Sequence, residues 1–118
     1  MKTEIEYSSD LPEVQEYAAL FETTGWNDNA NKTPQELHRA ASASWRFVSA
    51  RIDGRLAGIG RVISDGVAHA FVVDFVIAPE YQGRSIGTAI LQRLVGAALD
   101  KGIRDIQLFA AKGKGGFT

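Results

Sequence analysis

The sequence predicts a mixed α/β fold, in which helices flank a central sheet whose strands are mostly antiparallel. Three observations lead to this prediction: an early amphipathic helix pattern, two extended runs joined by a tight turn, and an apolar run that leads through a glycine-bearing loop into a second helix. Strand and helix patterns do not alternate strictly, which argues against an all-parallel fold. The chain has 118 residues, and we expect a single domain over residues 1–118.

The first half of the chain predicts a strand followed by two helices. Residues 3–8 alternate apolar and charged side chains, as in a short half-buried strand. Residues 11–23 repeat apolar side chains at intervals of three and four, which indicates an amphipathic helix with Asp10 as its N-cap. Residues 25–32 are polar and typical of a turn, apart from Trp26. The sequence Thr-Pro-Gln-Glu from Thr33 then predicts a second helix.

The second half begins with a predicted hairpin. Residues 45–52 and 56–64 are extended runs joined by Asp53-Gly54, a dipeptide that readily adopts the positive φ angles of a two-residue hairpin turn. Residues 69–77 are almost continuously apolar, which predicts a central strand covered on both faces, although Asp74 interrupts the run. The remaining predicted elements are a helix at residues 85–101, ended by Gly102, and a strand at residues 103–110.

Composition excludes several classes of function. Thirteen basic and fourteen acidic side chains give a net charge of −1, so we expect no binding to nucleic acid or to an anionic membrane. The sequence has no signal-peptide pattern at its start and no apolar stretch of the roughly 18 residues that a membrane span needs, which favours a cytoplasmic location. It contains no cysteine and only two histidines, far apart, so we expect no metal site and no cysteine nucleophile.

The loop at residues 81–88 carries the main functional signal. A strand that turns into a helix leaves the first backbone N–H groups of the helix without intrahelical acceptors, and a phosphate can accept from them. Glycine at this place lets a ligand approach the main chain, and Arg84 adds a charged donor. The alternative is that the glycines only permit tight packing. The Walker pattern and the dinucleotide-binding pattern of glycines are both absent.

At these residues the chain resembles the GNAT superfamily of N-acetyltransferases. The family signature is Gln or Arg, two residues, Gly, one residue, then Gly or Ala, after a strand that ends near a proline. Gln82, Arg84, Ile86 and Gly87 match it, as does the segment 75–79. The resemblance implies acetyl-CoA as cosubstrate. The cofactor-binding residues that it implies are Phe75, Val76 and Ile77 beside the pantetheine arm, and Gln82, Gly83, Arg84, Ser85, Ile86, Gly87 and Thr88 at the pyrophosphate.

The sequence departs from the family pattern at two places. Ser85 replaces the usual glycine, so we expect its backbone to avoid a positive φ, and its hydroxyl to cap the helix or to contact a phosphate oxygen. The family pattern also continues past residues 115–117 with more helix and closing strands. Truncation, completion of the sheet by another chain, and impaired function are the alternatives.

Asp74 is the candidate catalytic residue. A carboxylate in an apolar strand is costly to bury unless it is paired or hydrogen-bonded, and desolvation would raise its pKa toward that of a useful base. In position it also resembles an acidic residue of the glucosamine-phosphate branch of the family. It would hold the substrate amine or accept its proton through water, and the alternative is a structural carboxylate. Trp26 and Asp28 are candidate substrate-binding residues, because the resemblance places their loop at the acceptor pocket; the alternative is an anchored surface loop.

The resulting hypothesis is direct transfer of an acetyl group from acetyl-CoA to a primary amine of a small molecule or peptide. No activated serine or cysteine is visible, so no covalent enzyme intermediate is expected. One alternative is a non-catalytic module that binds CoA. Another is an interaction protein whose last strand, at residues 103–110, pairs with another chain, for instance in a homodimer.

Overall fold

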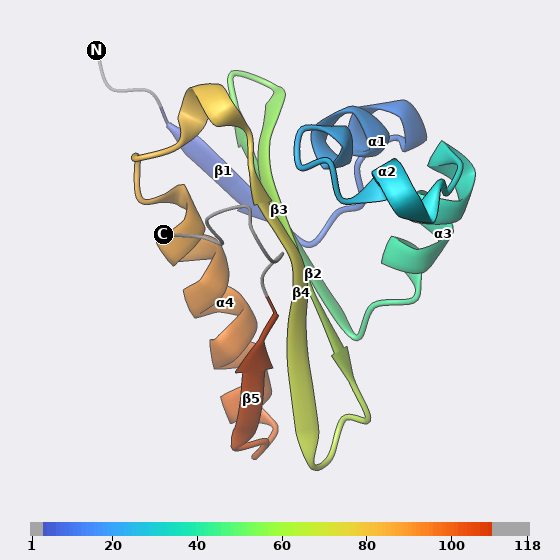
Figure 1. Cartoon of the computed structure of the whole chain (residues 1–118). Coiled ribbons are helices and arrows are strands. Elements are labelled where there is room, and N and C mark those ends of the chain that lie inside the picture. Colours follow the sequence, from blue (N-terminus) through green and yellow to red (C-terminus); the bar gives the residue numbers. More distant parts are fainter. Residues whose placement is uncertain (1–3, 110–118) are drawn as a thin grey trace.

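The computed structural model describes residues 4–109, without the side chains of residues 29 and 30. One long helix, α4, lies against one face of a five-stranded sheet, and the short helices α1 to α3 lie against the other (Figure 1). None of the helices in this part of the chain is long and apolar enough to span a membrane. The strands are β1 (Ile5–Ser8), β2 (Arg46–Ile52), β3 (Arg55–Ser64), β4 (His69–Ile77) and β5 (Asp105–Leu108). The helices are α1 (Val14–Glu22), α2 (Asn27–Ala30), α3 (Pro34–Ser42), the 3-10 turn η1 (Pro79–Tyr81) and α4 (Ile86–Asp100).

The mixed, mostly antiparallel sheet confirms the predicted fold class. The strand order is β1-β2-β3-β4-β5, and all neighbouring pairs are antiparallel except β4 with β5, which is parallel. As predicted, residues 69–77 form a strand inside the sheet with helices on both faces, but this strand is less buried than expected. β3 occupies the middle of the sheet, and most of the side chains of β4 beyond Val72 are only half-buried.

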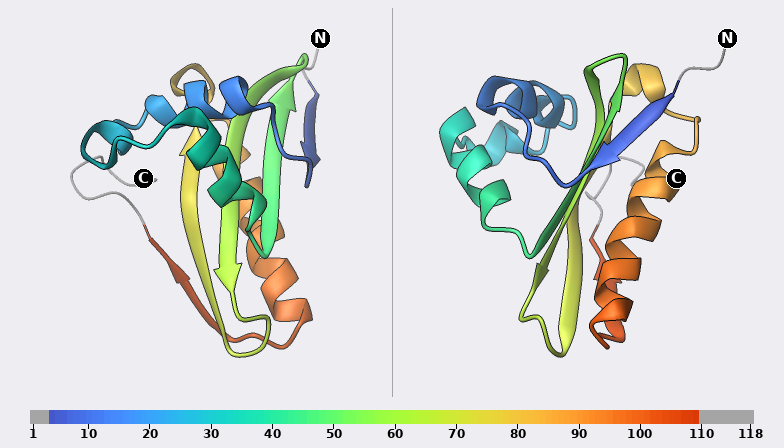
Figure 2. Two further views of the ribbon diagram at one scale, coloured as in Figure 1. Left: turned by 90° about the vertical axis from the view of Figure 1, so that its right-hand side faces the viewer. Right: turned by 180° about the vertical axis from the view of Figure 1, so that it is seen from behind.

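The two strands β4 and β5 meet at one end and then diverge (Figure 2). Their register runs from His69 opposite Asp105 to Val72 opposite Leu108, and the Phe109 N–H adds a last hydrogen bond to the Val72 carbonyl at 3.0 Å. The predicted strand at residues 103–110 is therefore shorter than expected, and residue 110 lies outside the described residues. Beyond Val72, β4 no longer pairs with β5.

The hairpin between β2 and β3 confirms the prediction from Asp53-Gly54. Both residues have positive φ angles, 52° and 79°, as the tight turn requires. On β3, Gly60 allows α4 to lie close to the sheet, because a Cβ at Gly60 would come within 2.9 Å of side-chain atoms of Ile90 and Leu94. The long helix is thus packed against the middle strand through a position that has no side chain.

The helical layer differs from its prediction at two places. α1 begins at Val14 with Glu13 as N-cap, and the prediction that Asp10 caps it is wrong. The reason is that Asp10 is held against β2, where its carbonyl accepts a hydrogen bond from the Ser49 hydroxyl at 3.2 Å. Residues 25–32 contain the short helix α2, which the sequence did not predict. Asn27 closes this turn, because its side chain both donates to and accepts from the backbone of Lys32 at 2.8 Å.

The helix predicted to start at Thr33 is confirmed as α3, and a capping box forms at its start. The Glu36 N–H donates to the Thr33 hydroxyl at 3.1 Å, and the Thr33 N–H donates to the Glu36 carboxylate at 2.9 Å. Two otherwise unpaired backbone donors at the start of this helix are thereby satisfied within the chain.

Candidate active site

The loop between β4 and α4 presents a row of free backbone donors. Within residues 4–109, no hydrogen-bond acceptor lies on the N–H groups of residues 83–88. The first helical hydrogen bond of α4 comes only at Ala89, whose N–H donates to the Ser85 carbonyl at 3.2 Å. Free N–H groups and the positive end of the helix dipole together favour a bound anion. This geometry matches the expectation that the sequence raised for the loop.

Ser85 adopts a backbone conformation that the sequence analysis did not expect. Its φ is 65°, in the left-handed region, so the prediction that the backbone avoids a positive φ here is wrong. Its hydroxyl makes no capping hydrogen bond either. The chain reverses from the loop into α4 at this residue, and that reversal requires a left-handed residue whether or not it is glycine. The start of α4 therefore carries no side-chain cap.

The rest of the loop is anchored beside these free donors. The Gln82 side-chain amide donates to the Ile77 carbonyl at 3.2 Å, which ties the loop to the end of β4. Arg84 lies over the ring of Tyr81, with 5.6 Å from its Cζ atom to the ring centroid. Gln82, Gly83, Arg84 and Ser85 are all exposed. The loop is thus held in place while its donors remain accessible.

The other residues predicted to bind the cofactor also serve packing. Ile86 is 1% exposed, and Val76 is 5% exposed among the aromatic side chains of α1. A Cβ at Gly87 would lie 3.1 Å from the Phe75 ring, so this glycine lets α4 pack on β4. Ile77 is half-buried and Thr88 is exposed. Both explanations of the glycine pattern thus apply here, each to different residues, and the cofactor role of the whole set stays a prediction.

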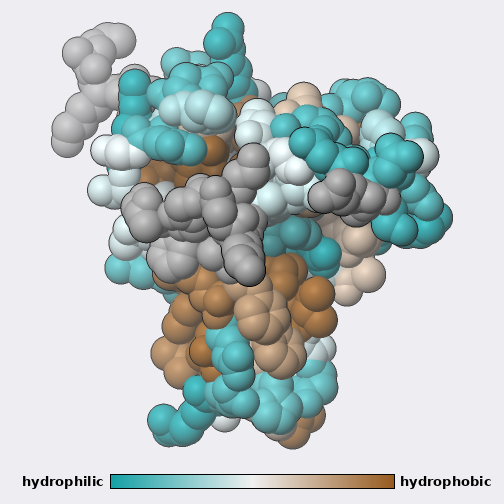
Figure 3. Space-filling model, viewed as in Figure 1, coloured by the Kyte–Doolittle hydropathy of each residue, from teal (hydrophilic) through white to brown (hydrophobic). Residues whose placement is uncertain are grey.

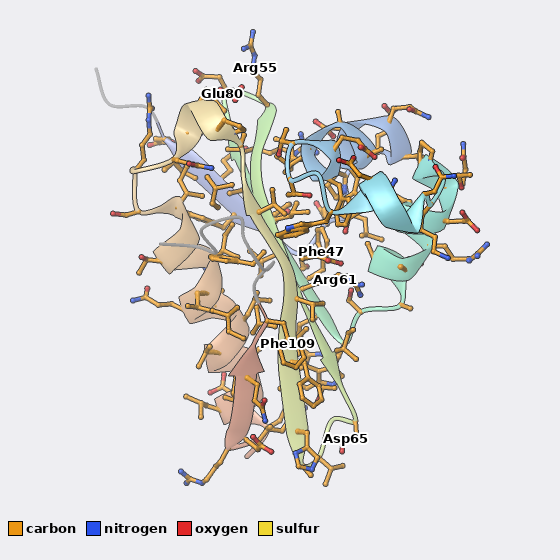
Figure 4. All side chains as sticks on the ribbon, in the orientation of Figure 1. Phe47, Arg55, Arg61, Asp65, Glu80 and Phe109 are labelled. Atoms are coloured by element: carbon orange, nitrogen blue, oxygen red, sulfur yellow. The ribbon has the colours of Figure 1, made fainter. Side chains whose placement is uncertain are left out.

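Asp74, the candidate catalytic residue, lies at a bulge in β4 and pairs with Arg61 of β3 (Figure 4 labels Arg61). The Arg61 Nε atom donates to the Asp74 Oδ2 atom at 2.7 Å, and the two side chains are 12% and 23% exposed. Between the pairs Ile59–Val76 and Arg61–Val73, β4 carries one more residue than β3, and Asp74 has a φ of 51°. The carboxylate is therefore neither isolated nor fully buried.

Tyr17 of α1 completes this polar group beneath the helical layer. It is 1% exposed, and burial raises the pKa of its phenol to about 12, with the Asp74 charge acting in the same direction and Arg61 opposing it. Neither Tyr17 nor Arg61 was predicted from the sequence to belong to the site. A signal existed for Arg61, because an arginine within a strand of buried residues needs an acidic partner.

The candidate substrate-binding residues are not brought together. Trp26 packs edge-on against Phe21, with 5.7 Å between ring centroids, and joins the cluster that contains Val76. Its indole N–H is buried and has no acceptor among the described residues. Asp28, by contrast, is exposed on α2. In the same part of the chain, no three His, Asp or Glu side chains group as metal ligands would.

An apolar surface accompanies the place where β4 and β5 meet. Figure 3 shows apolar side chains gathered over the lower part of this face. Phe71 and Phe109 stack there with 5.5 Å between ring centroids, and Phe109 is 54% exposed. β5 is an edge strand of the described sheet, and its pairing with another chain stays a prediction.

Most of the chain matches a known protein family, and about half of it matches named relatives. The model of a family described as the acetyltransferase (GNAT) family matches residues 11–113. A GCN5-related N-acetyltransferase 2, chloroplastic, of Arabidopsis thaliana is 41% identical over 56 residues, which are 48% of this chain and 22% of that protein. A serotonin N-acetyltransferase 2, chloroplastic, of Oryza sativa subsp. japonica is 40% identical over 57 residues, which are 48% of this chain and 28% of that protein. The matched segments thus span about a quarter of each relative.

Solved structures share the fold over almost the whole chain. A GNAT-family acetyltransferase of Streptococcus pneumoniae superposes with a TM-score of 0.73 at 23% identity, covering 96% of this chain and 79% of that one. The PaiA N-acetyltransferase of Thermoplasma acidophilum, solved in complex with coenzyme A, superposes with a TM-score of 0.68 at 17% identity, covering 95% of this chain and 82% of that one. At these identities the likeness shows the fold alone.

Proposed function

Because the chain belongs to the acetyltransferase (GNAT) family, we propose that it transfers the acetyl group of acetyl-CoA to a primary amine of a small molecule or peptide. The observation that carries this proposal is the row of unpaired N–H groups at residues 83–88. These donors, the dipole of α4 and the exposed Arg84 fit the pyrophosphate of CoA. A relative named for serotonin acetylation supports an amine as the acceptor.

The divergence of β4 and β5 supplies the place for the pantetheine arm in this proposal. The β4–β5 register ends with Val72 opposite Leu108, and the open loop lies at the far end of β4. An extended pantetheine chain carries amide groups that pair with strand backbone, as an added strand would. The thioester then lies along β4, near the bulge at Asp74.

Bound acetyl-CoA supplies an electrophilic thioester carbonyl. The chain holds the amine next to this carbonyl, so that its nitrogen forms the new C–N bond as the C–S bond breaks and CoA leaves as its thiolate, which takes up a proton from solvent. Asp74 binds the amine in this proposal and accepts its proton, directly or through a water molecule. One oxygen of its carboxylate accepts a hydrogen bond from Arg61, and in this proposal the other meets the amine.

Release of free thiol from acetyl-CoA tests the proposal. We expect steady thiol release when a panel of primary amines is added, with formation of the N-acetyl product measured by mass spectrometry. Binding of CoA is measured in parallel by titration calorimetry. Tight binding of CoA with no thiol release for any amine would favour the alternative, a non-catalytic CoA-binding module. No binding of CoA by the folded protein would contradict both.

A further inference from the structure

The contacts of Arg61 extend well beyond its ion pair with Asp74. Its Nη1 atom also donates to the Ala40 carbonyl at 3.2 Å and to the Ser44 hydroxyl at 3.3 Å. Ala40 lies in the last turn of α3, and Ser44 follows that helix. A single guanidinium therefore joins the bulge of β4 to the end of the helical layer, with donors in the fixed directions that lysine lacks.

The bulge that Arg61 contacts is an unusual backbone conformation. A non-glycine residue with φ of 51° is disfavoured and persists only where surrounding contacts hold it. Among the described residues, Arg61 is the side chain that hydrogen-bonds to the Asp74 carboxylate, and Tyr17 lies near enough to sense its charge. Arg61 is itself opposite Val73 in the β3–β4 register, next to the extra residue of β4. The guanidinium thus acts on both the carboxylate and the strand that carries it.

We propose that Arg61 is a positioning residue, which fixes the β4 bulge and turns the Asp74 carboxylate so that one oxygen is engaged and the other faces the acceptor amine. This inference deepens the proposed function and rests on it, because Asp74 binds the amine there. The proposal also places the end of α3 on the acceptor side of the site, because Ala40 and Ser44 accept hydrogen bonds from the same guanidinium.

The test compares Arg61→Gln with a matched control in the same fold. Arg51 of β2 forms a similar but bidentate ion pair with Glu16 of α1, at 2.6 and 2.8 Å, so Arg51→Gln breaks an ion pair of the same kind away from β4. We expect Arg61→Gln to raise the KM for the amine about tenfold, in line with the loss of a charged hydrogen bond. The Kd for CoA should stay unchanged, and Arg51→Gln should alter neither constant.

Two further measurements separate positioning from a merely structural role. In backbone amide NMR spectra, Arg61→Gln should shift the signals of residues 73–76 and leave those of residues 83–88 in place. In an Asp74→Asn background, Arg61→Gln should have little further effect on the amine KM, because the partner is already lost. Arg61→Lys should restore only part of the function, since lysine keeps the charge but not the fork of donors.

The outcomes are distinguishable from failure of the proposed function. Unmoved signals at residues 73–76 in Arg61→Gln would overturn the inference, whether or not any amine is acetylated. An increase in the amine KM with an equal loss of CoA affinity would also overturn it, as would additive effects of Arg61→Gln and Asp74→Asn on the amine KM. If the wild-type protein acetylates no amine, the proposed function fails, and the NMR comparison decides on the positioning of the bulge by itself.

Discussion

The two helices α3 and α4 begin in opposite ways. At the start of α3, Thr33 and Glu36 satisfy each other's backbone N–H groups through their side chains. At the start of α4, Ser85 gives no such bond, and within residues 4–109 the preceding loop leaves its donors free as well. Both helices are held by packing, so the difference lies in their first turns. The start of α3 is thus completed by the chain's own side chains, and the start of α4 is the one that can accept an anion.

The largest expected effect comes from closing the open helix start. Ser85→Asp places a carboxylate at the first turn of α4, where it competes with the pyrophosphate for the same N–H groups and repels it. We expect the Kd for CoA to rise at least about tenfold, which corresponds to about 1.4 kcal/mol. Titration calorimetry measures the change.

Ser85→Gly is the matched control for this variant. Glycine accepts the left-handed backbone found at this residue and adds no charge, so CoA affinity should be kept. Equal losses of affinity in Ser85→Asp and Ser85→Gly would show that the open donors are not the anion site.

Opening the closed helix start gives the next largest effect. Thr33→Ala removes the hydroxyl that accepts from the Glu36 N–H, and we expect a loss of about 1 kcal/mol in the free energy of unfolding. CoA binding should not change, because α3 lies on the other face of the sheet from α4. Urea unfolding and calorimetry on the same samples check both parts. A marked change in CoA affinity would mean that the two helix starts are coupled.

The turn between β3 and β4 also has a row of backbone N–H groups, and a substitution there should have the smallest effect of the three. At the turn between β3 and β4, the Asp65 carboxylate accepts from the N–H groups of Val67, Ala68 and His69, and these bonds lower its pKa to about 2 (Figure 4 labels Asp65). The folded state thus favours the charged form, so the stabilisation is present above the ordinary pKa of 3.8 and is lost as pH falls through about 2. Asp65→Asn should remove this part of the acid dependence.

Acid unfolding followed by circular dichroism measures that effect. The stability difference between the wild type and Asp65→Asn should shrink as the pH falls from 3.8 toward 2. A difference that stays constant over this range would contradict the assigned role of the carboxylate. The row of N–H groups at this turn is closed by the chain's own side chain, unlike the row at residues 83–88.

Sequence reasoning predicted features that depend on neighbouring residues. The capping box at Thr33, the turn at Asp53-Gly54 and the free donors before α4 all follow from short-range patterns, and the structure contains each of them. The wrong predictions depend on distant partners. Asp10 is held by Ser49 across the sheet, and the exposure of β4 depends on where β5 diverges.

The candidate site divides in the same way. The loop with the free donors is continuous in the sequence, so residue types and spacing were enough to single it out. The polar group at the bulge joins Tyr17, Arg61 and Asp74 from three separate elements. Only Asp74 was singled out from the sequence, because no local pattern says which arginine faces it. The positive φ of Ser85 was missed since the family's glycine is absent there and only the path of the chain requires it.

The absence of a side chain at Gly60 links the packing of the core to the position of α4. Any Cβ there would push Ile90 and Leu94 outward, and these residues belong to the helix whose first turn carries the free donors. The rest of the β4–α4 loop would stay tethered to the strand by Gln82. A side chain at Gly60 would therefore tilt α4 against its own loop and move the free donors of its first turn, although Gly60 is not part of that loop.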